Sequence, residues 1–220
     1  MPKKDGGTTP WTGDGRHGPG TAYALHHNAR GRNGRERSGS RREQEDSIQY
    51  HALYDPLTGL PNRTLCMDRI DHALARVARY GNRAGLLCLD INTFRSVNES
   101  LGLDVGDQVL REAGQRIQSS LREMDTAARM GDDEFVVVLQ DIEDADEAVS
   151  VGQRIRKSLG RPFAACGTIC RELVVSIGIS VCPEHGTTVD ALLKKADQAM
   201  YRAKRHKQGG VALWEDLLVV

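Results

Sequence analysis

The chain has 220 residues, with 30 Lys and Arg against 30 Asp and Glu, so its formal net charge is zero and names no partner. This length is enough for one domain with a sizeable core. No run of about 18 apolar residues occurs, which argues against a helical membrane span, and the N-terminus lacks the apolar stretch of a secretory signal.

The charges are unevenly distributed along the chain. Residues 1–42 hold nine Lys or Arg and three Asp or Glu, a charge of +6, so the remainder sums to −6. This segment is nearly free of aliphatic side chains, and burial cannot offset the entropy of ordering it, so we expect a disordered basic tail. Such a tail could bind nucleic acid or an acidic surface. A solvated linker or a misassigned translation start is the favoured interpretation, and nucleic acid is not expected as a partner.

Ordered structure is predicted from residue 43 onward, with an amphipathic linker helix over 43–54 and one domain over 55–215. Periodicity predicts helices over 65–80, 106–121, 144–159 and 189–205, and strands over 85–90, 126–130, 135–139, 173–181 and, at an edge, 211–213. The tight segment Gly131–Glu134 is predicted to close a hairpin. This order predicts an α/β (α+β) sandwich, a mixed, mainly antiparallel sheet flanked by helices.

The five cysteines are odd in number, scattered and mostly set among apolar residues. This pattern is typical of reduced thiols, and we therefore expect a cytoplasmic protein. A cysteine metal site would need two close pairs, whereas only Cys166 and Cys170 lie near each other. Metal binding by cysteine is not expected.

Acidic residues end one predicted core strand and fill the predicted hairpin. Asp90 is the last residue of the strand 85–90, and the hairpin reads Asp132-Asp133-Glu134. Clustered carboxylates raise one another's pKa unless a cation lies among them, and Mg²⁺ is the ion that such oxygen ligands prefer. The alternative is a solvated acidic turn, which would be the favoured interpretation for the hairpin taken alone.

Polar residues also follow Asp90, in a segment predicted to be a loop that opens toward a helix. Backbone N–H groups there could cradle phosphates, and Arg95 would add positive charge. Asn98 offers a donor and an acceptor, and an ionised Asp107 could accept from the two adjacent donors of guanine. Turn formation and helix capping are the alternative roles, and spacing alone favours them.

Six segments, taken together and in order, resemble the motifs of the GGDEF diguanylate cyclases. They are Asp55-x-Leu-Thr-Gly-Leu-x-Asn-Arg63, Asp90-x-Asn-x-Phe-Arg-x-x-Asn98, Gly106-Asp107, Ala128-Arg-x-Gly-Asp-Asp-Glu-Phe135, Val175-Ser-Ile-Gly178 and Ala196-Asp-x-Ala-Met-Tyr-x-Ala-Lys204. The resemblance implies a fold similar to the palm of nucleotide cyclases and polymerases. It implies a transferase that joins two GTP into cyclic di-GMP, a bacterial second messenger, and releases two pyrophosphates. Each domain would hold one GTP, so a homodimer is required.

The resemblance also assigns roles to individual residues. Asp90, Asp133 and the carbonyl of Ile91 would hold Mg²⁺ or Mn²⁺, and Glu134 together with Asp133 would be catalytic. The substrate-binding residues implied are Asn98 and Asp107 for guanine, Lys204 for phosphate, and Phe94, Arg95, Gly131 and Asp132 in the adjoining segments. Arg122-Glu-Met-Asp125 matches the family's Arg-x-x-Asp motif and implies an allosteric site at which cyclic di-GMP inhibits its own synthesis.

Three positions depart from the family pattern. Asp132 replaces the second glycine of the signature, Leu103 replaces a usual histidine, and Arg205-His-Lys-Gln-Gly-Gly210 replaces a usual Gly-Arg-Asn after Lys204. A carboxylate about 4 Å from a phosphate is unfavourable by roughly 1 kcal/mol in water and about 4 kcal/mol at an effective dielectric constant of 20. Two hypotheses follow: an active or weakened cyclase, or a catalytically silent domain that binds cyclic di-GMP or GTP and regulates a partner.

Overall fold

The structure is a computed structural model that describes residues 52–165, 168–170, 173–205 and 209–215. The predicted basic tail and nearly all of the predicted linker helix lie outside these residues. None of the helices in the described residues is long and apolar enough to cross a membrane.

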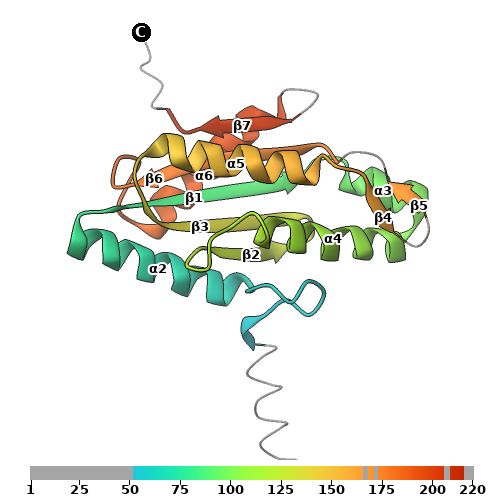
Figure 1. Cartoon of the computed structure of the whole chain (residues 1–220), viewed down its shortest axis with the longest axis horizontal. Coiled ribbons are helices and arrows are strands. Elements are labelled where there is room, and N and C mark those ends of the chain that lie inside the picture. The colour runs from blue at the N-terminus through green and yellow to red at the C-terminus, as the bar shows by residue number, and fades with distance from the viewer. Residues whose placement is uncertain (1–51, 166–167, 171–172, 206–208, 216–220) are drawn as a thin grey trace, which may run out of the picture. The chain divides into compact units, whose positions relative to one another are not determined.

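A five-stranded sheet forms the centre of the domain, in the order β2-β3-β1-β6-β7 (Figure 1). Its strands are β1 (Arg83–Ile91), β2 (Thr126–Gly131), β3 (Glu134–Ile142), β6 (Val175–Cys182) and β7 (Gly210–Leu213). Strand β1 is antiparallel to both of its neighbours, β2 is antiparallel to β3, and only β7 runs parallel to its neighbour. The predicted mixed, mainly antiparallel sheet is confirmed.

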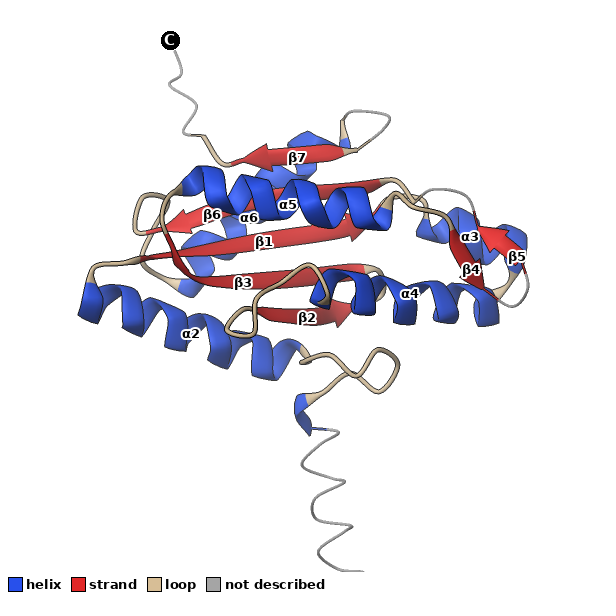
Figure 2. Cartoon of the chain, viewed as in Figure 1, coloured by secondary structure: helices blue, strands red, loops and turns tan. Residues whose placement is uncertain are grey.

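Two helices cover each face of this sheet (Figure 2). Helices α4 (Leu103–Gln118) and α5 (Ala145–Leu159) pack on one face, and α2 (Arg63–Tyr80) and α6 (Val189–Lys204) pack on the other. Strand β1 is buried along nearly its whole length because it is the central strand and is covered on both sides. This explains why its sequence is a continuous apolar run that ends in a single acid.

Local signals set the ends of these helices. The side chains of Asn62, Asp144 and Thr188 accept hydrogen bonds from the first turns of α2, α5 and α6. Helix α2 ends at Gly81, whose φ of 72° is the left-handed conformation that glycine adopts readily. Helix α6, which Thr188 caps at its start, ends at Lys204. The ammonium of Lys204 lies beside Asp90 at the end of β1.

The sequence-based interpretation of the segment after Asp90 was wrong in one respect. The predicted loop is mostly helical: α3 (Phe94–Leu101) is followed directly by α4, which begins three residues earlier than predicted. Gly102, with a φ of 89°, separates the two helices. A small hairpin, β4 (Phe163–Ala165) with β5 (Thr168–Cys170), was not predicted, because three-residue strands give no periodic signal.

Candidate functional site

Asp90 is a nearly buried carboxylate at the end of the central strand. It lies opposite Glu134 on β3 and Ser176 on β6, and it is 7% exposed. The ammonium of Lys204 lies 2.7 Å from Asp90 Oδ2, and the two side chains are 35% and 10% exposed. An isolated buried carboxylate is strongly unfavourable, so this ion pair supplies the charge that Asp90 needs in the fold.

The predicted hairpin is confirmed, and its turn has an unusual backbone conformation. Gly131 has a φ of 148° and Asp132 a φ of 34°, which few residues other than glycine adopt. Arg129 holds this turn, because its Nη2 and Nε donate to the carbonyl of Asp132 at 2.7 and 3.2 Å. The turn is therefore closed with Asp132 in it.

Asp133 is half-buried in this turn, and its pKa is raised. Burial is the main cause, and the charges of Asp90 and Asp132 add to it, while Lys204 acts in the opposite direction. The carboxylates of Asp90, Asp132, Asp133 and Glu134, which we call the acidic edge, are thus close enough for Asp90 and Asp132 to disfavour the charge on Asp133.

The acidic edge has the donors that a hard divalent cation uses. Within the described residues, no three His, Cys, Asp or Glu side chains form a ready metal cluster. Mg²⁺, however, is usually held by one or two carboxylates together with phosphate oxygens and water. Asp90 and Asp133 offer carboxylate oxygens that fit such an ion, and a bound cation would favour the charged form of Asp133, whose pKa burial and the neighbouring Asp90 raise.

Arg129 also connects the turn to the segment that precedes α2. Its Nη1 lies 3.0 and 3.1 Å from the two carboxylate oxygens of Asp55, and both side chains are largely buried. Asp55 also accepts from the N–H and the hydroxyl of Thr58, at 2.8 and 2.6 Å. Burial by itself would raise the pKa of Asp55, but the hydrogen bonds from Thr58 and Arg129 outweigh it and lower the pKa.

Asn98, predicted to bind a base, presents an unsatisfied acceptor. Its Oδ1 is buried and has no hydrogen-bond partner within the described residues. An added Cβ at Gly106 would lie 1.8 Å from that atom, so only glycine leaves room for the Asn98 amide. Asp107 is half-exposed, and its nearest cation is Arg111 on the same helix, at 3.9 Å. Both residues therefore have capacity for a ligand.

The neighbouring candidates are placed differently. Phe94 is buried in the core on the α4 and α5 side of the sheet. Arg95 is exposed and pairs with Glu99 on its own helix at 2.9 Å. Leu103, the first residue of α4, is 73% exposed. The amide of Asn92, which follows β1, donates to Ser176 Oγ at 2.9 Å and ties the end of β1 to β6.

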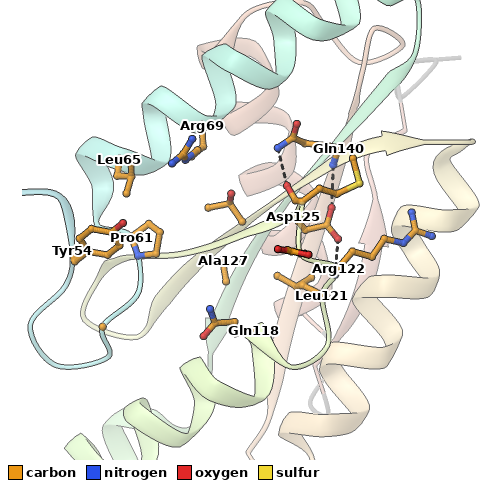
Figure 3. Close-up of a pocket in the computed structure, with 14 residues that line it drawn as sticks. Tyr54, Pro61, Leu65, Arg69, Gln118, Leu121, Arg122, Asp125, Ala127 and Gln140 are labelled. Atoms are coloured by element: carbon orange, nitrogen blue, oxygen red, sulfur yellow. Dashed lines mark hydrogen bonds between the residues drawn. The ribbon is translucent and has the colours of Figure 1, made fainter. Parts of the chain in front are cut away.

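A separate cavity of about 580 Å³ lies at the opposite end of β2, and we call it the arginine pocket. Arg122 and Asp125, the predicted allosteric residues, both line it, and so does Arg69 of α2. Figure 3 shows Leu65 and Arg69 on the α2 side of the cavity and Gln118 and Leu121 on the α4 side. Its volume is in the range of ligand pockets.

The two predicted residues of this pocket have different partners (Figure 3). Asp125 accepts backbone N–H groups with both oxygens, from Arg122 at 3.0 Å and from Gln140 at 3.2 Å. The guanidinium of Arg122 pairs with Glu147 of α5 at 2.6 Å, and the two side chains are 58% and 19% exposed. Asp125 therefore stabilises the turn, whereas the Arg122 guanidinium could leave Glu147 and bind a ligand.

Sequence reasoning missed the partners of these residues. Nothing in the motifs indicated that Lys204 contacts Asp90, that Glu147 contacts Arg122 or that Arg69 lines the pocket. The link between Asp55 and Arg129 had a signal, because each belongs to a motif quoted above, but the motifs do not say that they touch.

The family model described as "Diguanylate cyclase, GGDEF domain" matches residues 52–210. The chain is 35% identical over 173 residues to the diguanylate cyclase TpbB of Pseudomonas aeruginosa, covering 79% of this chain and 40% of TpbB. It is 38% identical over 162 residues to the response regulator PleD of Caulobacter vibrioides, covering 73% and 36%. It is also 37% identical over 169 residues to the cyclic di-GMP phosphodiesterase PdeR of Escherichia coli, covering 76% and 25%. The chain thus spans two fifths or less of the length of these relatives.

Solved structures give the same result. The GGDEF domain of TpbB (YfiN) from P. aeruginosa matches with a TM-score of 0.71 and 37% identity, over 74% of this chain and 94% of that one. The coiled coil and GGDEF domain of DgcB from Caulobacter crescentus, solved in complex with cyclic di-GMP, matches with a TM-score of 0.72 and 26% identity, over 82% and 95%. The chain belongs to the diguanylate cyclase GGDEF domain family.

Proposed function

We propose that this chain is a diguanylate cyclase that condenses two GTP into cyclic di-GMP and releases two pyrophosphates. The observation that carries the proposal is the acidic edge, where the nearly buried Asp90 at the end of the central strand lies close enough to Asp133 in the β2–β3 turn to raise the pKa of Asp133. Asp90, Asp133 and the Ile91 carbonyl would hold Mg²⁺ or Mn²⁺, which would neutralise charge on the transferred phosphate.

The remaining proposed roles follow from the same geometry. Glu134 lies opposite Asp90 in the register and is exposed, so it can accept the proton of the attacking 3′-hydroxyl. The unsatisfied Oδ1 of Asn98 and the half-exposed Asp107 suit the adjacent N–H donors at N1 and N2 of guanine, whereas adenine has an acceptor at N1. Lys204 would contact phosphate.

The proposal includes a homodimer, because each domain would hold one GTP. It also places cyclic di-GMP in the arginine pocket as an allosteric inhibitor, with Arg122 as the group that contacts it. We place the reaction in the cytoplasm, the compartment expected from the thiols. Cys66, Cys88 and Cys182 are buried and unpaired, and burial raises the pKa of Cys66 to about 12.

The second candidate is a silent domain that binds cyclic di-GMP or GTP and regulates a partner. Asp132 favours it, because the exposed carboxylate adds negative charge where phosphates would bind. The similarity to PdeR, which is named as a phosphodiesterase, is as high as the similarity to TpbB, so identity does not separate the two functions.

Incubation of the purified chain with GTP and Mg²⁺ tests the proposal, with nucleotides resolved by chromatography after denaturation to release bound product. We expect cyclic di-GMP to accumulate with time and Glu134→Gln to reduce the rate about 10²- to 10⁴-fold. Asp132→Gly should raise the rate at least about fivefold, the equivalent of about 1 kcal/mol. If both the wild type and Asp132→Gly bind nucleotide without turnover, the silent-domain function is correct.

A further inference from the structure

Lys204 occupies the position beside Asp90 that a metal ion would need. Its ammonium lies 2.7 Å from Asp90 Oδ2, although the proposed function assigns Asp90 to the metal and Lys204 to phosphate. A divalent ion on the same carboxylate would lie within a few ångströms of this ammonium, and the two cations would repel each other. In the arrangement that the structure has, the Lys204 ammonium therefore opposes the binding of a divalent ion to Asp90.

We propose that Lys204 is the resident counter-ion of Asp90 in the nucleotide-free chain, and that it moves to the substrate phosphates when a divalent ion binds Asp90. This inference rests on the proposed function, because it takes Asp90 as a metal ligand. Lys204 is then a positioning residue for the empty state of the site as well as a substrate contact.

The surroundings of Asp90 explain why a resident cation is needed. Its strand neighbours are Glu134 on β3 and Ser176 on β6, and neither supplies positive charge. Asp133 and Asp132 are acidic as well. With Asp90 only 10% exposed, water cannot replace the missing positive charge, so Lys204 stabilises the edge when no other cation is present.

The placement of Lys204 also allows it to leave. Lys204 is the last residue of α6, and its side chain is 35% exposed. The flexible side chain can therefore reach solvent without a movement of the helix backbone. Asp90, in contrast, is fixed within the central strand. The Asp90 carboxylate therefore stays in place, and the cation beside it changes from the Lys204 ammonium to the divalent ion.

Metal and nucleotide binding to purified 220-residue protein, measured separately, tests the exchange. We compare wild type with Lys204→Met, using Mn²⁺ alone by electron paramagnetic resonance and GTP with Ca²⁺ by calorimetry. If Lys204 competes with the ion, Lys204→Met binds Mn²⁺ about tenfold more tightly, because one like charge has been removed from its neighbourhood. The same variant binds GTP more weakly, because the phosphates lose a partner.

Arg202→Met is the matched control, because it removes one charge from the same helix. Arg202 lies over the Trp214 ring at 4.8 Å and donates to the Glu215 carbonyl, whereas the ammonium of Lys204 is on Asp90. It should leave the affinity for Mn²⁺ within about twofold of the wild type. A tenfold increase in the Mn²⁺ affinity of Arg202→Met as well would mean that the affinity depends on net charge and not on Lys204.

The outcomes separate the inference from the proposed function. If Asp90→Asn loses Mn²⁺ binding but Lys204→Met binds Mn²⁺ no better than wild type, the ion pair is a fixed structural bond and the exchange is wrong, while the metal site stands. If Mn²⁺ binds neither the wild type nor Lys204→Met, or Asp90→Asn does not weaken it, both the metal site and the exchange are wrong. A variant that merely misfolded would lose both affinities, whereas the exchange predicts changes of opposite sign.

Discussion

The two ends of strand β2 each carry an aspartate, and the surroundings of the two carboxyl groups differ. At the acidic edge, which follows β2, carboxylates lie near one another, and the pKa of Asp133 is raised by burial and by its acidic neighbours. At the arginine pocket, which precedes β2, both oxygens of Asp125 already accept N–H groups. The surroundings of Asp133 therefore disfavour its charged form, whereas Asp125 has a backbone N–H partner on each oxygen. An acid that lacks partners is the better candidate for ligand binding, and an acid with full partners is the better candidate for a structural role.

The largest effect expected from this comparison concerns Asp55, a fully bonded acid beside Tyr54 and Gly59 of the pocket wall. Asp55→Asn should lower the free energy of unfolding at pH 7 by about 1–2 kcal/mol, because charge-assisted hydrogen bonds are weakened. The pKa of Asp55 is lowered in the fold, so this contribution is present above the unfolded value of 3.8 and is lost as the pH falls through the folded value.

Denaturant unfolding of wild type and Asp55→Asn at pH 7, 5 and 3 measures this difference. Asp71→Asn, a change at an exposed residue of α2, is the charge-matched control and should have little effect. A difference between wild type and Asp55→Asn that grows on acidification would show that Asp55 is not stabilised by its partners.

A smaller effect is expected at Glu147, which pairs with Arg122. Glu147→Gln should increase the affinity for cyclic di-GMP by up to about fivefold, because the Arg122 end of the pair is 58% exposed, such a pair is worth at most about 1 kcal/mol, and the ligand must break it. The glutamine oxygen can still accept from the Glu143 N–H, so the start of α5 is kept.

Calorimetry with cyclic di-GMP measures this change, with Asp146→Asn in the same helical turn as the control. Unchanged affinity in Glu147→Gln, together with lost binding in Arg122→Ala, would mean that Arg122 binds the ligand without leaving Glu147. If Arg122→Ala binds cyclic di-GMP as tightly as the wild type, Arg122 does not bind this ligand.

The smallest effect is expected at Asp133. Its raised pKa means that the charged form is disfavoured in the fold, so its contribution to stability worsens as the pH rises above 3.8 through the folded pKa. Asp133→Asn should therefore raise Tm at pH 7, without divalent ions, by about 1–2 °C, and the gain should disappear in acid. Scanning calorimetry with and without Mg²⁺ measures it. A lower Tm at pH 7 would contradict the view that this edge is short of positive charge.

The sequence predicted the main elements because their signals are strong and local. The run 85–90 is apolar throughout because β1 is covered on both faces, and the hairpin signal survives Asp132 because aspartate tolerates a left-handed conformation. Helix α3 was missed although Phe94, Val97 and Leu101 recur at helical spacing, because it has only eight residues and buries only Phe94. The family motifs named Asp90 and Arg122, which the structure places at the acidic edge and in the arginine pocket.

The partners of these residues could not be predicted. Lys204 and Asp90 belong to different elements, and only the packing of α6 against β1 brings them together. Glu147 lies in no motif, and its contact with Arg122 depends on where α5 begins. The sequence thus identifies the charged residues, whereas the packing decides which opposite charge lies beside each of them.

Arg129 has a consequence for how the native domain opens. It joins the Asp55 turn, where the N–H of Gly59 donates to the Asp55 carbonyl, to the turn at Asp132. Native proteins exchange amide hydrogens through cooperative local openings, and segments that share a bond open together. We expect the Gly59 and Asp132 turns to exchange as one unit. A nucleotide that orders the hairpin would then also slow exchange at Gly59 in the wall of the arginine pocket, so its binding at the acidic edge could be detected in that wall.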